Sequence, residues 1–129
     1  MKTPYSGRRE DAPFDIKERT FQFGVRIVGL ANKLPNSVAG VEIARQLIRA
    51  GTSIGSNMEE ADAAVSKRDF VNGVRISRKE ARESRYWLSI IKAADLLSDA
   101  EVPAMIQESS ELVRILSGII RSSTGHGTK

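Results

Sequence analysis

One uninterrupted helical pattern occupies the middle of the chain, in the run VEIARQLIRAGTSIGSNMEEADAA (residues 41–64). Apolar or small residues recur there at steps of three and four, at Val41, Ala44, Ile48, Gly51, Gly55 and Met58. A second, adjacent stripe repeats every seven residues, at Leu47, Ile54 and Ala61. With Ser37 as N-cap, the pattern predicts a helix over about 37–64. Its apolar surface is broad enough for more than one neighbour.

Three more helices are predicted on either side of this one. Asp15 with Glu18 begins a helix over about 15–34, which Pro35 ends. Its apolar spacing falls on Phe21, Val25, Val28, Ala31 or Asn32, and Leu34. Ser66 begins a third helix over about 67–97, and Ser98 or Asp99 begins a fourth over about 100–122, which Gly125 ends. No segment shows the alternation of a strand.

The two later helices each carry one clear apolar stripe. In the third it comprises Phe70, Val74, Ala81, Leu88 and Ile91. In the fourth it comprises Val102, Met105 or Ile106, Leu112 or Val113, Leu116, and Ile119 or Ile120. Four amphipathic helices with short connections predict an all-α fold, an antiparallel up-down four-helix bundle over residues 14–122. Residues 1–13 are predicted to be a flexible arm and residues 123–129 a disordered tail.

The composition excludes most classes of enzyme. The 129 residues include no cysteine and one histidine, His126 in the polar tail. Disulfides, thiolate metal sites, cysteine nucleophiles and histidine triads are therefore excluded. No apolar run approaches the roughly 20 residues of a membrane span, and no signal-peptide core begins the chain. We expect a cytoplasmic, non-enzymatic protein with no cofactor, no metal, no membrane partner and no identified small-molecule substrate.

The predicted third helix carries an excess of positive charge. Between residues 67 and 92 there are eight basic and three acidic side chains. Six of the basic residues fall in one arc of about 120°: Arg68, Arg75, Arg78, Lys79, Arg82 and Arg85. Like charges four residues apart disfavour a helix slightly, so this arc is typical of a helix with an anionic partner. The partner is either nucleic-acid phosphate or the acids of neighbouring helices or subunits.

No recognised nucleic-acid-binding motif accompanies these charges, and the few aromatic residues argue against a base-stacking platform. The acids Glu59, Glu60, Asp62, Glu80 and Glu83 lack the histidines of a helical di-iron site. We expect them to pair with Arg45, Arg49, Arg75 or Arg82 instead.

A further group of residues points to close helix packing or a subunit interface: Gly51, Ile54, Gly55, Asn57 and Trp87. Two glycines in a helix cost stability unless another backbone approaches them, so Gly51 and Gly55 predict a packing notch. The alternative is a polar pocket formed with Thr52, Ser53, Ser56 and Asn57. Trp87 with Tyr86 is either core-edge packing or an intersubunit anchor.

The run QLIRAGTSIGSNMEEA (residues 46–61) resembles the QLxRxxxSIxxNxxEA signature of the bacterial four helix bundle protein family, also called the 23S rRNA-intervening-sequence protein or S23 family. The runs SKRDF (66–70), KEARE (79–83) and YWL (86–88) agree with it, and the resemblance covers about residues 14–120. It implies small up-down bundles that assemble as homopentamers, some of them encoded within intervening sequences of 23S rRNA genes. A related branch acts as the accessory protein of diversity-generating retroelements, with a reverse transcriptase and RNA as partners. The resemblance implies no enzymatic activity and therefore no catalytic residues.

Together, these features predict a homo-oligomeric adaptor that binds RNA, or a complex of nucleic acid and protein, through the basic face of the third helix. The alternative is a pure protein-interaction scaffold whose basic face serves subunit assembly. The surplus stripe of the second helix and the edge of Trp87 predict a ring-like oligomer.

Overall fold

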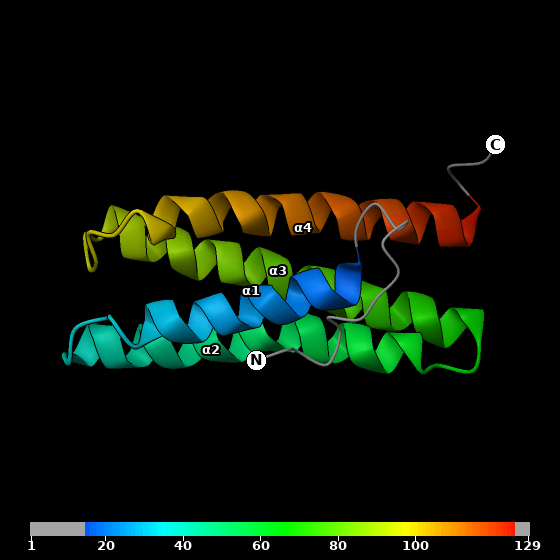
Figure 1. The fold of residues 1–129 in the computed structure, drawn as a ribbon, viewed down its shortest axis with the longest axis horizontal. Coiled ribbons are helices and arrows are strands. Elements are labelled where there is room, and N and C mark those ends of the chain that lie inside the picture. Colours follow the sequence, from blue (N-terminus) through cyan, green and yellow to red (C-terminus); the bar gives the residue numbers. More distant parts are fainter. Residues whose placement is uncertain (1–14, 126–129) are drawn as a thin grey trace.

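The computed structural model describes residues 15–125, which form four antiparallel helices (Figure 1). These are α1 (Ile16–Ala31), α2 (Val38–Asp62), α3 (Lys67–Ala93) and α4 (Glu101–Thr124). No residue in this range belongs to a strand, so the predicted all-α four-helix bundle is confirmed. The arm predicted over residues 1–13 lies outside the described residues, as does the end of the predicted tail.

Each helix begins where a side chain can accept hydrogen bonds from its first amides. Asp15 accepts from the N–H of Lys17, Ser37 from that of Gly40 and Ser66 from that of Asp69. At the start of α4, Oδ1 of Asp99 accepts from the N–H of Glu101 at 2.8 Å. The predicted helix starts are therefore confirmed, because capping depends on residues next to each other in the chain.

The ends of the helices differ more from prediction. The first helix ends at Ala31 rather than about residue 34, because the N–H of Lys33 and that of Leu34 bond carbonyls three residues back, in a tighter turn before Pro35. The fourth helix continues to Thr124 before Gly125 ends it at φ 83°, so residues 123–124 of the predicted tail are helical.

The third helix ends at Ala93 rather than about residue 97, because Asp95 adopts a left-handed conformation with φ 57°. The N–H of Asp95 bonds the Lys92 carbonyl at 3.1 Å, and the N–H of Leu96 bonds the Ile91 carbonyl at 3.0 Å. This pair of bonds is a Schellman motif, which usually has glycine at the left-handed position. Because aspartate occupies this position instead of glycine, the sequence gives no sign that the helix ends here.

The core forms from the predicted stripes of α3 and α4 and from the seven-residue stripe of α2. Fully buried side chains include Leu47, Ile54, Val74, Ala81, Leu88, Ile91, Met105, Leu112 and Leu116. The other predicted stripe of α2 lies at the edge toward α1. There Val41 is exposed and Ile48 half-buried, and only Gly51 and Met58 are buried.

In α1 the predicted stripe is wrong as a core stripe over Val25 and Val28, although Ala31 is buried and Leu34 packs against the core. Phe23, Ile27 and Leu30 are buried, whereas Val25 is 51% exposed and Val28 is 39% exposed. The helix carries two apolar stripes, and the one with the larger side chains faces the core. Periodicity shows that both stripes exist but does not choose between them. The displaced stripe leaves apolar side chains on the surface.

The four helices run along one another (Figure 1), but the contacts between them differ in kind. Extensive packing joins α1 to α2, α2 to α3 and α3 to α4, whereas α1 and α4 have few contacts. Ion pairs bridge that sparse edge: Arg19 with Glu108 at 2.7 Å, Arg26 with Glu101 at 2.9 Å, and Lys33 with Asp99 at 3.0 Å. The α1/α4 edge is therefore held largely by charge.

Candidate nucleic-acid interface

The six predicted basic residues divide into an outer and an inner row along α3. Arg68, Arg75, Lys79 and Arg82 are exposed. The half-buried Arg78 and Arg85 lie nearer α4, where Arg78 donates to Oγ of Ser117 at 3.1 Å and Arg85 to Oγ of Ser110 at 3.3 Å. Two hydroxyls of α4 therefore hold the inner row in place.

Arg78 is the most constrained of these cations. Its Nε is buried and has no hydrogen-bond partner among the described residues. Burial lowers the pKa of its guanidinium, and the charges of Arg82 and Arg75 lower that pKa further. An arginine stays charged in spite of such a shift. Arg78 therefore places a partly buried positive charge beside those of Arg82 and Arg75, with no acid paired to it in the described range.

The basic residues of α3 differ from those of α1 and α2 in their ion pairing. Every Lys and Arg of α1 and α2 pairs with an acid: Lys17, Arg19, Arg26, Arg45 and Arg49. None of the eight basic residues of α3 forms an ion pair with any residue between 15 and 125. The described part of the subunit therefore supplies no acid to the α3 cations.

Three of the acids expected to balance them pair with basic residues of α1 and α2 instead. Arg49 of α2 pairs with Glu83 and, at 3.6 Å, with Glu80, while Asp62 pairs with Lys17 at 2.8 Å. Of the four arginines expected to pair with these acids, Arg49 does so, whereas Arg75 and Arg82 form no ion pair in the described range and Arg45 pairs with Glu42 instead. Within residues 15–125 no three His, Cys, Asp or Glu side chains form a group able to hold a metal ion.

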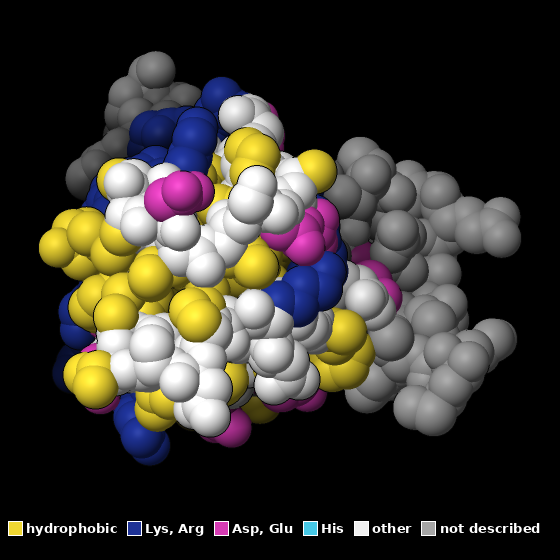
Figure 2. Space-filling model, turned by 90° about the vertical axis from the view of Figure 1, so that its left-hand side faces the viewer, with side chains coloured by type: hydrophobic (Ala, Val, Ile, Leu, Met, Phe, Trp, Pro, Cys, Tyr) yellow, Lys and Arg dark blue, Asp and Glu magenta, His cyan; other side chains and the backbone are white. Residues whose placement is uncertain are grey.

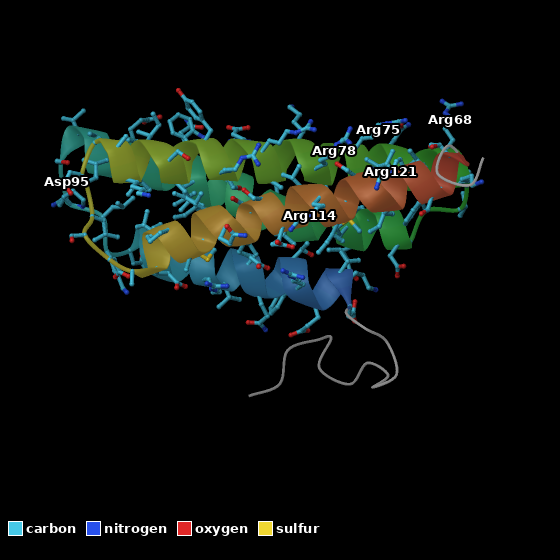
Figure 3. All side chains as sticks on the ribbon, turned by 90° about the horizontal axis from the view of Figure 1, so that it is seen from above. Arg68, Arg75, Arg78, Asp95, Arg114 and Arg121 are labelled. Carbon is cyan, nitrogen blue, oxygen red and sulfur yellow. The ribbon has the colours of Figure 1, made fainter. Side chains whose placement is uncertain are left out.

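The structure adds Arg121 of α4 to the site. Figure 3 shows Arg121 in the same part of the molecule as Arg68, Arg75 and Arg78, whereas Arg114 lies farther along α4. Arg121 is exposed and has no ion pair within the described range, while Arg114 pairs with Glu111. Sequence reasoning missed Arg121 because only the antiparallel register of α3 and α4 brings it there.

We call the combined set the α3/α4 basic face: Arg68, Arg75, Arg78, Lys79, Arg82, Arg85 and Arg121. Figure 2 shows the opposite end of the bundle from Arg68 and Arg121, the end that carries the α1–α2 and α3–α4 connections. Lys and Arg side chains lie there toward the top of the view and at a few other places, and hydrophobic side chains reach the surface on its left flank.

The residues predicted for packing or an interface do not form one site. Ile54 is fully buried. A Cβ at Gly51 would lie 2.8 Å from the Ile27 side chain, and one at Gly55 would lie 3.2 Å from the Thr20 carbonyl oxygen. Both glycines therefore lie where α1 approaches α2. Asn57 instead donates to the Ser53 carbonyl of its own helix at 2.8 Å.

Trp87 belongs to the contact between α2 and α3. Its half-buried indole donates to Glu83 at 3.2 Å, and Glu83 also pairs with Arg49. The Tyr86 ring packs on it edge to face, with ring centroids 5.2 Å apart. Trp87 thus lies at the edge of the core, whereas Tyr86 is 58% exposed.

A groove between α1 and α2 is the second surface feature that sequence reasoning missed. It has a volume of about 360 Å³ and is lined by Thr20, Phe21, Gly24, Val25, Val28, Thr52, Gly55, Ser56 and Glu59. We call it the α1/α2 groove. The stripe of α1 that faces away from the core forms one wall. Of the predicted polar pocket, Thr52 and Ser56 line this groove, whereas Ser53 and Asn57 do not.

No helix in the described range is both long enough and apolar enough to cross a membrane. No curated protein matches the sequence. A crystal structure of a protein of unknown function from the S23 ribosomal protein family of Bacteroides thetaiotaomicron is similar to this chain, with 33% identity and a TM-score of 0.74. The similarity covers 83% of this chain and 99% of that one. The model of the 23S rRNA-intervening sequence protein family matches residues 13–118, and the chain belongs to this family.

Proposed function

We propose that this protein is a homo-oligomeric adaptor that binds RNA through the phosphates, using the α3/α4 basic face. The observation that carries the proposal is the pairing asymmetry: all the basic residues of α1 and α2 have acidic partners, and none of those in α3 has one within residues 15–125. Unpaired arginines suit phosphate, because the planar guanidinium can donate two parallel hydrogen bonds. The protein acts in this proposal by binding rather than by catalysis.

The spacing of the cations suits a nucleic-acid strand. Arg75, Arg78, Arg82 and Arg85 cover about 15 Å of helix at about 1.5 Å per residue. Phosphates along a strand lie roughly 6 Å apart, so this length meets two or three of them in succession. Contacts to phosphate carry no base information, so binding should depend little on sequence and strongly on salt.

The α1/α2 groove supports the oligomeric part of the proposal, with a second copy of this chain as its occupant. Val25 and Val28, which line the groove, are 51% and 39% exposed. Exposed apolar side chains in a groove are typical of interaction sites. Several subunits in one assembly would repeat the basic face, so that weak phosphate contacts add through avidity.

A matched pair of charge-reversal variants tests the RNA-binding part. Arg75→Glu with Arg82→Glu removes two exposed cations of the face, neither of which bonds another described side chain. The control is Arg45→Glu with Arg114→Glu, which changes the net charge equally but removes only exposed pairs three residues apart. Fluorescence anisotropy with labelled RNA should show an affinity loss of about 100-fold for the first variant and little loss for the control.

Light scattering on the same variants separates this function from the scaffold alternative. If the α3 cations pair with acids of a neighbouring subunit, the first variant should dissociate and wild-type protein should not retain RNA at low salt. If they bind phosphate, the variant should keep the wild-type mass while losing RNA. For three phosphate contacts, wild-type affinity should fall about 20- to 40-fold between about 50 and 200 mM salt.

A further inference from the structure

The exposed outer row of α3 continues past Arg82 to an aromatic residue, Tyr86. Steps of three and four residues lead from Arg68 through Arg75, Lys79 and Arg82 to Tyr86, with Asn72 between the first two. All of these side chains are exposed, and Tyr86 is the only aromatic residue among them. The row runs about 27 Å along the helix. We call it the α3 stripe.

The Tyr86 ring is positioned by a chain of contacts that reaches the neighbouring helix. It packs edge to face on Trp87 at an interplanar angle of 74°. Trp87 in turn donates to Glu83 at 3.2 Å, and Glu83 pairs with Arg49 of α2. An aromatic ring that is 58% exposed and yet supported in this way is preorganised for a flat partner.

We infer that the ligand of the α3 stripe is single-stranded RNA, with one unpaired base stacked on Tyr86 and the adjoining phosphates on Arg75, Lys79 and Arg82. This inference rests on the proposed function. Any base offers a π face to an aromatic side chain, whereas the bases of a duplex already stack on one another. Arg82 and Tyr86 are one helical turn apart, about 6 Å along the axis, which is about one nucleotide step. One exposed tyrosine serves one base and needs no platform of several aromatic residues.

The test compares Tyr86→Ala and Tyr86→Phe on two RNA probes, an oligoadenylate dodecamer and a duplex of the same length. Loss of one base–aromatic stack should weaken binding of the dodecamer about tenfold in Tyr86→Ala. Tyr86→Phe keeps the ring and should bind as wild type does. Affinity for the duplex should change less than about twofold in either variant, because phosphate contacts alone hold it.

Wild-type protein supplies a second measurement, because Trp87 is the only tryptophan in the chain. A base on Tyr86 lies close enough to Trp87 to alter its fluorescence. Oligoadenylate should therefore change the emission at saturation. A polyphosphate chain, which offers charge without bases, should leave it unchanged.

Three results would overturn the inference. Equal affinity of Tyr86→Ala and wild type for oligoadenylate would contradict base stacking while leaving the proposed function intact. A changed mass of Tyr86→Ala in light scattering would make Tyr86 a subunit anchor instead. Wild-type protein that binds neither probe at low salt would contradict the proposed function itself.

Discussion

The α1/α2 groove and the α3/α4 basic face contrast in both chemistry and construction. In the groove, glycines let two helices approach closely, and the exposed side chains nearby are chiefly valines. On the basic face, serines of α4 hold arginines of α3, and the outer cations have no acid within residues 15–125. One bundle thus offers a largely apolar groove, whose one charged lining residue is Glu59, and a face of unpaired cations.

The contrast is also one of specificity. Packing at a glycine notch depends on shape at the scale of one methyl group, whereas a row of arginines tolerates any arrangement of phosphates within reach. Substitutions should therefore act differently on the two surfaces. Changes in the α1/α2 half should affect folding and assembly, and changes of the exposed cations of the basic face should affect ligand affinity alone.

The largest effect is expected at the notch. Gly51→Leu should lower the free energy of unfolding by about 3 kcal/mol, because even a Cβ there lies 2.8 Å from Ile27. The matched control is Gly29→Ala in α1, where nothing lies within 4 Å of the added carbon. That control should gain about 0.5–1 kcal/mol from helix propensity. Urea denaturation measures both, and an unchanged midpoint for Gly51→Leu would show that α1 is not seated against α2.

The next effect concerns assembly. Val28→Asp puts a charge on the groove wall and should weaken self-association by about 2–3 kcal/mol per interface. Val65→Asp is the control, because Val65 is 98% exposed in the connection before α3 and lies outside the groove. Light scattering over a dilution series reports the mass. A Val28→Asp protein that keeps the wild-type mass at every concentration would exclude the groove as the contact.

A smaller effect is expected at the charged edge that joins the two halves. The hydrogen bond from Arg26 lowers the pKa of Glu101, and the backbone N–H of Glu101 lowers that of Asp99 with help from Lys33. Carboxyl groups with lowered folded-state pKa values stabilise the fold above their ordinary range, and this contribution disappears as the pH falls through the folded values. Stability should therefore decline below about pH 4.5.

The melting temperature should depend less on pH in the acid range when Arg26 is replaced by Gln, because the pKa of Glu101 then lies nearer its ordinary value. Thermal melts at several pH values measure this. Arg45→Gln is the comparison, since Arg45 has only an exposed neighbour on its own helix. Identical acid profiles for wild type and Arg26→Gln would contradict the assigned role of this pair.

The smallest effect is expected at the end of α3. Asp95→Gly should raise the free energy of unfolding by about 0.5–1 kcal/mol, because glycine adopts φ 57° without strain. Asp95→Ala should bring no such gain, since alanine also disfavours this conformation. Calorimetry on the two variants decides whether the left-handed conformation of Asp95 is strained. Equal melting temperatures of Asp95→Gly and Asp95→Ala would show that it is not.

The parts of the fold that could be predicted depend on neighbours in the chain, and the rest depends on packing. Asp15, Ser37 and Ser66 locate three helix starts because caps act within one turn. Which side of α1 packs against the core could not be predicted. Phe23 and Val25 lie on two different apolar stripes, and only packing with the other helices decides which stripe is buried. At the candidate site, the arc on α3 was visible from spacing, but Arg121 joins it only through the register of two antiparallel helices.

The sparse edge between α1 and α4 has a consequence for the order of local stability. The first helix packs extensively on α2 alone and is held to α4 largely by ion pairs, so its amides should exchange with solvent before those of the other helices. The same helix supplies Val25 and Val28 to the groove. In an oligomer formed through that groove, a neighbouring subunit would pack against α1 and stabilise it. The local unfolding of α1 would then depend on protein concentration.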